Sequence, residues 1–128
     1  MTGEPGDDFP VLDDGALQDL KDDAGEAAAQ AFIEDYLLLL LARGLKIFKT
    51  LRRGDPAERL DAVLSLRASS EMVGAVRLAA YCCDIEKALK NGQSPDVGSV
   101  QKELSTQICN VIREASLRGH FPPKRRRF

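Results

Sequence analysis

The chain has 128 residues, 44% of them hydrophobic with few aromatics and no Trp, a composition that fills the core of one domain and favours an all-α fold. Its charge is unevenly spread, since residues 1–35 contain eleven acidic residues and one lysine while the remainder contains nine acidic and seventeen basic residues. The polar, acidic N-terminus predicts that there is no signal peptide. The apolar run at residues 37–41 is much shorter than the roughly 20 residues of a membrane span and is interpreted as a buried helix segment. The sequence therefore predicts a cytoplasmic protein without a membrane segment.

The N-terminal segment, residues 1–10, is polar and contains Gly and Pro, so it is predicted to be flexible. A short amphipathic helix follows, with Asp13 or Asp14 as its N-cap. Its apolar positions are Leu12, Ala16, Leu17 and Leu20. It is expected to end at residues 22–25.

Residues 26–53 are predicted to form one long helix. Alternating spacings of four and three mark a bundle seam on it, formed by Ile33, Leu37, Leu40, Gly44, Ile47 and Leu51. We expect five further residues to widen that seam: Phe32, Tyr36, Leu41, Leu45 and Phe48. Glycine within a helix costs about 1 kcal/mol relative to alanine, so Gly44 indicates a close helix crossing. The outer face is basic, with Arg43, Lys46, Lys49 and Arg53.

Residues 54–58 carry the clearest helix boundary in the sequence. Gly54 suits a left-handed residue that ends one helix. Asp55 is the predicted N-cap of the next helix, with Pro56 in its first turn and Glu58 completing a capping box. This third helix is expected to run to about Val73, before Gly74.

The third helix carries two apolar stripes. The first is a core face with small residues, formed by Ala62, Val63, Leu66, Ser69, Ser70 and Val73. The second lies on nearly the opposite side, beside Arg67 and Glu71, and is formed by Ala57, Leu60, Leu64 and Ala68. Because a surface helix normally buries one face, the second stripe needs a separate explanation.

Two more helices are predicted. Residues 75–90 place Leu78, Cys82, Ile85 and Leu89 inward. Ser94 and Pro95 are expected to open the last helix, whose inward positions are Val97, Val100, Leu104, Ile108, Val111 and Ala115. Four long helices joined by short loops indicate an up-and-down antiparallel four-helix bundle with a short extra N-terminal helix, spanning residues 11–118.

The remaining reactive residues are few. The three cysteines are interpreted as small core residues in a reducing compartment: Cys82, Cys83 and Cys109. Because the sequence has a single histidine, His120, no metal site is predicted. The tail, residues 119–128, contains a basic cluster that is expected to be flexible and solvated, with nucleic-acid contact the disfavoured alternative.

The third helix resembles the signature helix of histidine phosphotransfer (HPt) domains. In that family a His is followed by Leu at +2, Lys or Arg at +3, usually Gly at +4, a pair of small residues, and then Gly-Ala. Residues 64–75 supply Leu66, Arg67, the pair Ser69 and Ser70, and the closing Gly74 and Ala75. Leu64, however, stands at the His position, and Ala68 replaces the Gly, which removes room for a phosphate beside the helix.

The resemblance covers about residues 12–117. It implies a protein of two-component phosphorelays, in which HPt domains pass a phosphoryl group between histidine kinases and the aspartate of receiver domains, without ATP or a cofactor of their own. It also implies that receivers dock on the second and third helices, here residues 38–53 and 57–71.

Leucine has no lone pair with which to attack an aspartyl phosphate, so no catalytic residue is predicted. The sequence therefore indicates a pseudo-HPt that binds a receiver domain or a histidine kinase without carrying phosphate, and is neither an enzyme nor a small-molecule binder. Basic residues around exposed leucine complement the acidic pocket of a receiver. The predicted docking face comprises Leu60, Leu64, Arg67, Ala68 and Glu71 of the third helix with Lys46, Lys49 and Arg53 of the second.

Three alternatives stay open at this point. Leu60 and Leu64 would be covered if the first helix or the N-terminal segment lay over them. Phosphate transfer through Ser65 or His120 is disfavoured, because serine phosphoesters are poor donors and His120 lies in the tail. The third alternative is a helical module that self-associates or binds a protein unrelated to phosphorelays. The oligomeric state is left open.

Overall fold

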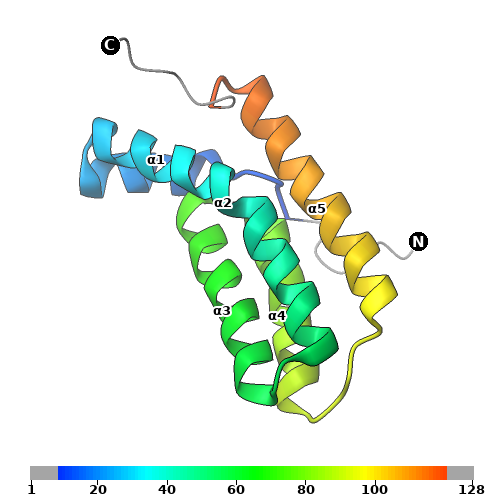
Figure 1. Cartoon of the computed structure of the whole chain (residues 1–128). Helices are drawn as coiled ribbons and strands as arrows, with labels where there is room; N and C mark the ends of the chain where they lie inside the picture. Colours follow the sequence, from blue (N-terminus) through cyan, green and yellow to red (C-terminus); the bar gives the residue numbers. More distant parts are fainter. Residues whose placement is uncertain (1–8, 121–128) are drawn as a thin grey trace, which may run out of the picture.

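A computed structural model describes residues 9–120 of the chain (Figure 1). Those residues form five α-helices and no strand: α1 (Asp14–Ala24), α2 (Glu26–Arg53), α3 (Pro56–Val73), α4 (Val76–Lys90) and α5 (Val97–Leu117). The all-α class is thereby confirmed. The basic cluster of the tail and most of the segment 1–10 lie outside the described residues, so those two predictions stay predictions.

The four long helices pack side by side. α2 contacts α3 and α5, and α4 contacts the same two helices, so each of the four has two long neighbours. α1 folds back along the first turns of α2 and also packs against α3 (Figure 1). None of the helices within residues 9–120 is long and apolar enough to span a membrane.

The core follows the predicted seam of α2, since every one of its six residues is buried. The predicted core face of α3 is buried as well, apart from Ser69, which is half-buried. Two residues expected to widen the α2 seam are not in the core: Leu41 is 60% exposed and Leu45 55% exposed. That prediction was wrong because α3 and α5 already cover the seam from both sides, which leaves the side of α2 with Leu41 and Leu45 without a neighbouring helix within residues 9–120.

Gly44 lies at a close crossing of α2 and α5, as predicted. A Cβ atom built on Gly44 would be 2.7 Å from Cδ1 of Ile108, closer than packed carbon atoms approach. The missing side chain therefore lets the two helices approach each other at this point.

The turn between α2 and α3 departs from the prediction at Gly54. Its φ is −70°, so the residue is extended and not left-handed. Glycine is required here for space, because a Cβ would lie 2.8 Å from the carbonyl oxygen of Thr50. The capping box is as predicted: Asp55 accepts from the Glu58 backbone N–H at 2.8 Å, and the Glu58 carboxylate accepts from the Asp55 N–H at 3.0 Å.

α1 closes one end of the four long helices. Asp13 caps it by accepting from the backbone N–H of Ala16, and the Asp13 N–H donates to the carbonyl of Gly74 at 2.8 Å. Leu12 and Leu17 are buried in the core cluster. Asp14 forms an ion pair with Arg118 at 2.7 Å, which ties α1 to the end of α5.

Two further expectations need correction. The last helix is capped by Asp96 and not opened by Ser94 and Pro95, because the Asp96 carboxylate accepts from the backbone N–H and hydroxyl of Ser99. Of the three cysteines only Cys82 is buried, while Cys83 is half-buried and Cys109 is exposed. Neighbouring positions on a helix point in different directions, so Cys82 and Cys83 could not both face the core.

Candidate functional site

The second apolar stripe of α3 lies at the surface. Of its four residues, Ala57 and Ala68 are exposed, while Leu60 and Leu64 are half-buried. Leu64 is in the middle of α3, on the side away from the buried residues Val63 and Leu66. The stripe is thus a surface feature and not part of the core.

The first helix does not cover this stripe. α1 meets α3 at the far end, where Gly74 lies against Asp13 and Ala16. Leu64 is ten residues earlier, which is about 15 Å along a helix. The alternative in which α1 covers Leu60 and Leu64 therefore loses its support. The other part of that alternative, in which the N-terminal segment covers them, involves residues 1–8, which lie outside the described residues.

A groove separates α2 from α3 beside Ala68. It encloses about 470 Å³ and is lined by Phe32, Asp35, Tyr36, Leu39, Arg43, Ser65, Ala68, Ser69 and Met72. The hydroxyl of Tyr36, one of the lining residues, shares a 2.8 Å hydrogen bond with the buried hydroxyl of Ser70, and burial raises the pKa of Tyr36 well above its usual value. Leu39 and Met72 are each about half exposed, so they line the groove with apolar surface that a partner could cover.

The sequence interpretation missed Leu39 and Met72. Leu39 belongs to the apolar run at residues 37–41, which was interpreted only as a buried segment. Met72 lies two residues before Gly74, within the stretch on which the resemblance rests. The i,i+4 spacing of Ala68 and Met72 would have placed Met72 beside Ala68 on the same face of a helix. The place of Leu39 depends on how α2 packs against α3, which no local pattern gives.

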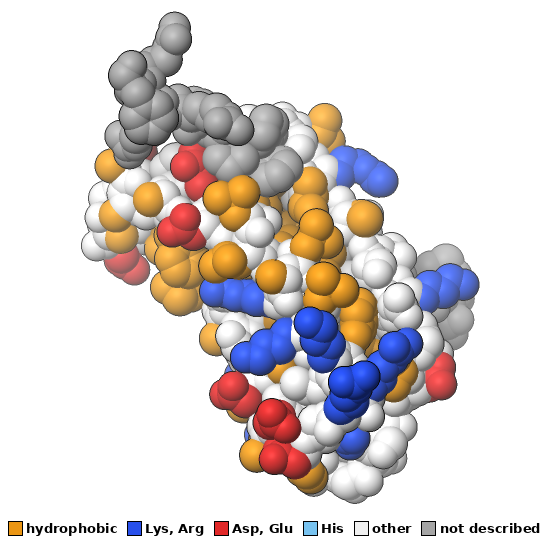
Figure 2. All heavy atoms as spheres, in the orientation of Figure 1, with side chains coloured by type: hydrophobic (Ala, Val, Ile, Leu, Met, Phe, Trp, Pro, Cys, Tyr) orange, Lys and Arg blue, Asp and Glu red, His pale blue; other side chains and the backbone are white. Residues whose placement is uncertain are grey.

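The outer face of α2 is basic, as predicted. Lys46, Lys49 and Arg53 are exposed, and Figure 2 shows Lys and Arg side chains gathered over the C-terminal part of this helix. Within residues 9–120 none of these three forms an ion pair. Their charge therefore remains available to an acidic partner.

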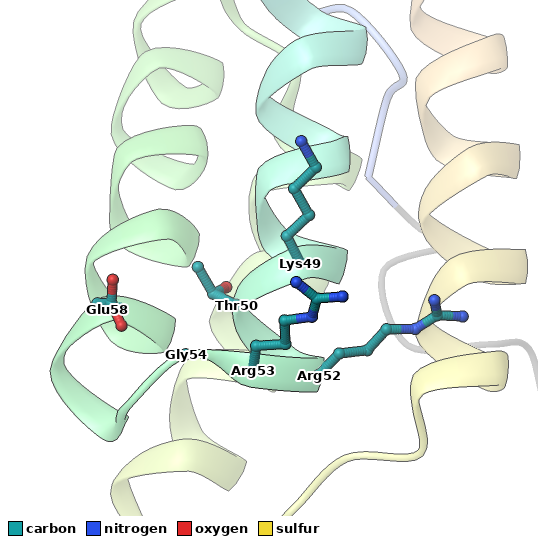
Figure 3. Close-up of a pocket in the computed structure, with 6 residues that line it drawn as sticks. All are labelled: Lys49, Thr50, Arg52, Arg53, Gly54 and Glu58. Atoms are coloured by element: carbon teal, nitrogen blue, oxygen red, sulfur yellow. The ribbon is translucent and has the colours of Figure 1, made fainter.

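An open hollow of about 550 Å³ lies where α2 turns into α3. It is lined by Lys49, Thr50, Arg52, Arg53, Gly54 and Glu58. Figure 3 shows the three basic side chains extending from the last turns of α2, away from Glu58. Lys49 and Arg53 of the predicted docking face thus lie together, and they are joined by Arg52, which the prediction did not include.

Arg67 has partners within the fold. Its guanidinium forms an ion pair with Glu86 of α4, and a second one with Glu71 at 3.5 Å. Glu86 also pairs with Lys90 at 2.7 Å. The hydrogen bond from Lys90 and that from Arg67 hold the pKa of the Glu86 carboxyl below its usual value. Arg67 therefore links α3 to α4, whatever contact it also makes with a partner.

The ion pairs of Glu86 with Arg67 and Lys90 predict that the stability of the fold depends on pH. Because the folded-state pKa of Glu86 is depressed, its contribution to stability is present above the unfolded pKa of about 4.3 and is lost as pH falls through the lower folded pKa. Glu86→Gln should lower the melting temperature at pH 7 by about 4 °C and should make it fall less steeply below pH 4. Thermal melts of both proteins from pH 7 to pH 3 measure this, and parallel curves would contradict the role given to Glu86.

Neither alternative phosphoacceptor has its side chain in a position like that of Leu64. Ser65 lines the groove and is exposed, but a serine phosphoester is a poor donor to aspartate. His120 lines a small apolar cavity under α1, together with Leu12 and Leu17. No cluster of three or more potential metal ligands exists within residues 9–120.

The comparisons with known proteins bear on the fold. No protein-family model and no curated protein matches the sequence. Among solved structures, the chain is similar to histidine-containing phosphotransfer protein B (HptB) from Pseudomonas aeruginosa PAO1, with a TM-score of 0.74 and 22% sequence identity. The match covers 88% of this chain and 97% of that one, so nearly the whole of that protein has a counterpart here. The chain therefore has an HPt-like fold.

Proposed function

We propose that this chain is an HPt-like protein of two-component phosphorelay signalling that binds a receiver domain or a histidine kinase and does not carry phosphate itself. The observation that carries the proposal is Leu64, a hydrocarbon side chain at the outward position of α3 where the HPt motif has its histidine. The HPt-like fold supports an up-and-down four-helix bundle with α1 across one end.

The surface around Leu64 suits an acidic partner with an apolar centre. Ala68, one turn after Leu64 on α3, lines the groove together with Leu39 of α2, whose side chain is 46% exposed. Lys46 and Arg53 stand exposed on the same helix as Leu39. An apolar centre with charged residues around it is the usual anatomy of a protein interface. Basic residues at the rim steer an acidic partner by long-range attraction and add to the association rate.

The loss of phosphate transfer follows from two substitutions in one region. Leu64 supplies no nucleophile, and the methyl group of Ala68 occupies space one turn further along the same face of α3. Both changes disfavour a phosphorylated side chain here, while neither removes apolar contact area. A binding role is thus compatible with the same surface that excludes transfer.

Leu64→Asp tests this assignment. A carboxylate at the centre of the docking face would have to be desolvated beside the acidic pocket of the receiver, so we expect binding to weaken by more than about 100-fold. Titration of purified receiver domains or kinase transmitter domains with wild-type and variant protein, by calorimetry, measures the change.

The matched control for that titration is Leu117→Asp. Leu117 is 75% exposed at the end of α5, so this variant adds the same charge far from the docking face. Binding should be unchanged in the control. Equal binding by wild type and Leu64→Asp would show that the docking face lies elsewhere.

A further inference from the structure

α2 carries a second heptad-like stripe, on a side of the helix that differs from both its buried seam and its basic face. The spacings again alternate between four and three residues, and the stripe comprises Ala27, Ala31, Glu34, Leu38, Leu41, Leu45, Phe48 and Arg52. From Glu34 onward each position is one residue after a member of the buried seam, which rotates the stripe by about 100° around the helix. We refer to these eight residues as the outer seam.

The centre of the outer seam is exposed leucine. Leu38 and Leu41 are each 60% exposed and Leu45 is 55% exposed. Figure 2 shows hydrophobic side chains over the middle of α2 on the face that the view presents. Three neighbouring leucines at helical spacing, each more than half exposed, form an apolar surface of the kind that marks protein–protein contacts.

The outer seam is not the groove beside Ala68. The mean direction of its three leucines lies roughly 130° around α2 from Leu39, which lines that groove. None of the three lines the groove or the hollow at the end of α2. A partner on these three leucines would therefore make contacts separate from those at the groove, while Arg52 at the end of the outer seam lines the hollow with Lys49 and Arg53.

Charge is divided along α2 on either side of these leucines. The N-terminal half carries Glu26, Glu34 and Asp35, and its C-terminal half carries five cations: Arg43, Lys46, Lys49, Arg52 and Arg53. An acidic end, an apolar middle and a basic end complement a second copy of the same helix that runs the opposite way. A parallel copy would instead place like charges side by side.

We propose that a second copy of this chain docks along the outer seam, with the two α2 helices antiparallel about a twofold axis. In the register that matches both apolar and charged positions, Leu41 lies opposite Leu45 of the second copy, and Leu38 lies opposite its Phe48. Glu34 then lies opposite Arg52. Each contact occurs twice, as in every twofold-symmetric interface.

The first test is the oligomeric state of the full chain. Sedimentation equilibrium from 1 to 500 µM should show a monomer–dimer equilibrium for the wild type, and Leu41→Asp should raise the dissociation constant at least about 100-fold by placing two carboxylates in an apolar interface. Leu117→Asp is the control and should leave the constant unchanged. A wild type that stays monomeric throughout, or equal effects of the two variants, would overturn the proposal.

The second test concerns the register. Glu34→Arg and Arg52→Glu should each weaken dimerisation by about tenfold, since each places two pairs of like charge in the interface. The double variant should dimerise as the wild type does. A double variant no better than either single one would overturn the antiparallel arrangement.

A receiver domain is the other candidate occupant of the outer seam. If Leu41→Asp abolished receiver binding while the wild type stayed monomeric, the seam would belong to the receiver and the dimer would be refuted. The expected result is that Leu41→Asp binds a receiver as the wild type does, because Leu64 is unchanged. The dimer and the proposed function can thus fail independently.

Discussion

Leu64→His combined with Ala68→Gly should enable this chain to accept phosphate from a phosphorylated receiver. The half-buried, outward position of Leu64 leaves one edge of an imidazole ring in solvent, where a nitrogen can attack the aspartyl phosphate. Replacing Ala68, which is exposed one turn later, clears space for the phosphorylated ring. Incubation with a receiver carrying labelled phosphate, followed by denaturation, should reveal acid-labile, base-stable label on the variant.

Two matched variants make this result interpretable. Leu64→Ala with Ala68→Gly has the same cleared space and no nucleophile, so it should take up no label. Leu64→His alone should take up less label than the double variant, because the Ala68 methyl group remains. A folded double variant that binds a receiver and stays unlabelled would count against the alignment of Leu64 with the histidine of the motif.

Gly74→Ala should destabilise the fold by about 2–4 kcal/mol. Gly74 ends α3 with a φ of +82°, where a side chain costs about 1–2 kcal/mol. An added Cβ would also lie 2.7 Å from the carbonyl oxygen of Asp13 and 3.0 Å from Cβ of Ala16. Relieving that overlap requires α1 to move away from the end of α3, which adds a cost typical of overpacked sites. Urea denaturation measures the change in the free energy of unfolding.

Gly92→Ala is the control that separates the two costs. Gly92 also has a positive φ, +75°, but a Cβ there would meet no atom within 4 Å. This variant should lose only about 1 kcal/mol, from the backbone conformation alone. Equal losses at Gly74 and Gly92 would show that the contact of α1 with the end of α3 contributes little to stability.

The sequence predicted the helices well because their signals are local. The Asp55 cap with its capping box, the seam that includes Leu40, and the end of α3 before Gly74 all depend on residues within a few positions of one another. Gly54 was interpreted wrongly since a left-handed turn and a close backbone approach select the same residue. Its extended φ is visible only once the carbonyl of Thr50 is placed.

The candidate site was harder to predict since its parts come from different helices. Arg67 and Glu86 are nineteen residues apart, so no local sequence pattern predicts that they form an ion pair. Leu41 and Leu45 have the period of a core face, and whether such a face is buried depends on which helices pack beside it. The groove likewise needs Leu39 of α2 and Met72 of α3 to be placed together.

The central claim is that this chain binds a receiver domain or a histidine kinase and does not carry phosphate itself. The most direct measurement is gel filtration of the wild-type chain with a receiver carrying labelled aspartyl phosphate, followed by denaturing electrophoresis of the complex. We predict that the label elutes with the complex and migrates with the receiver after denaturation. Label on this chain, or no complex with any receiver or histidine kinase tested, would contradict the account.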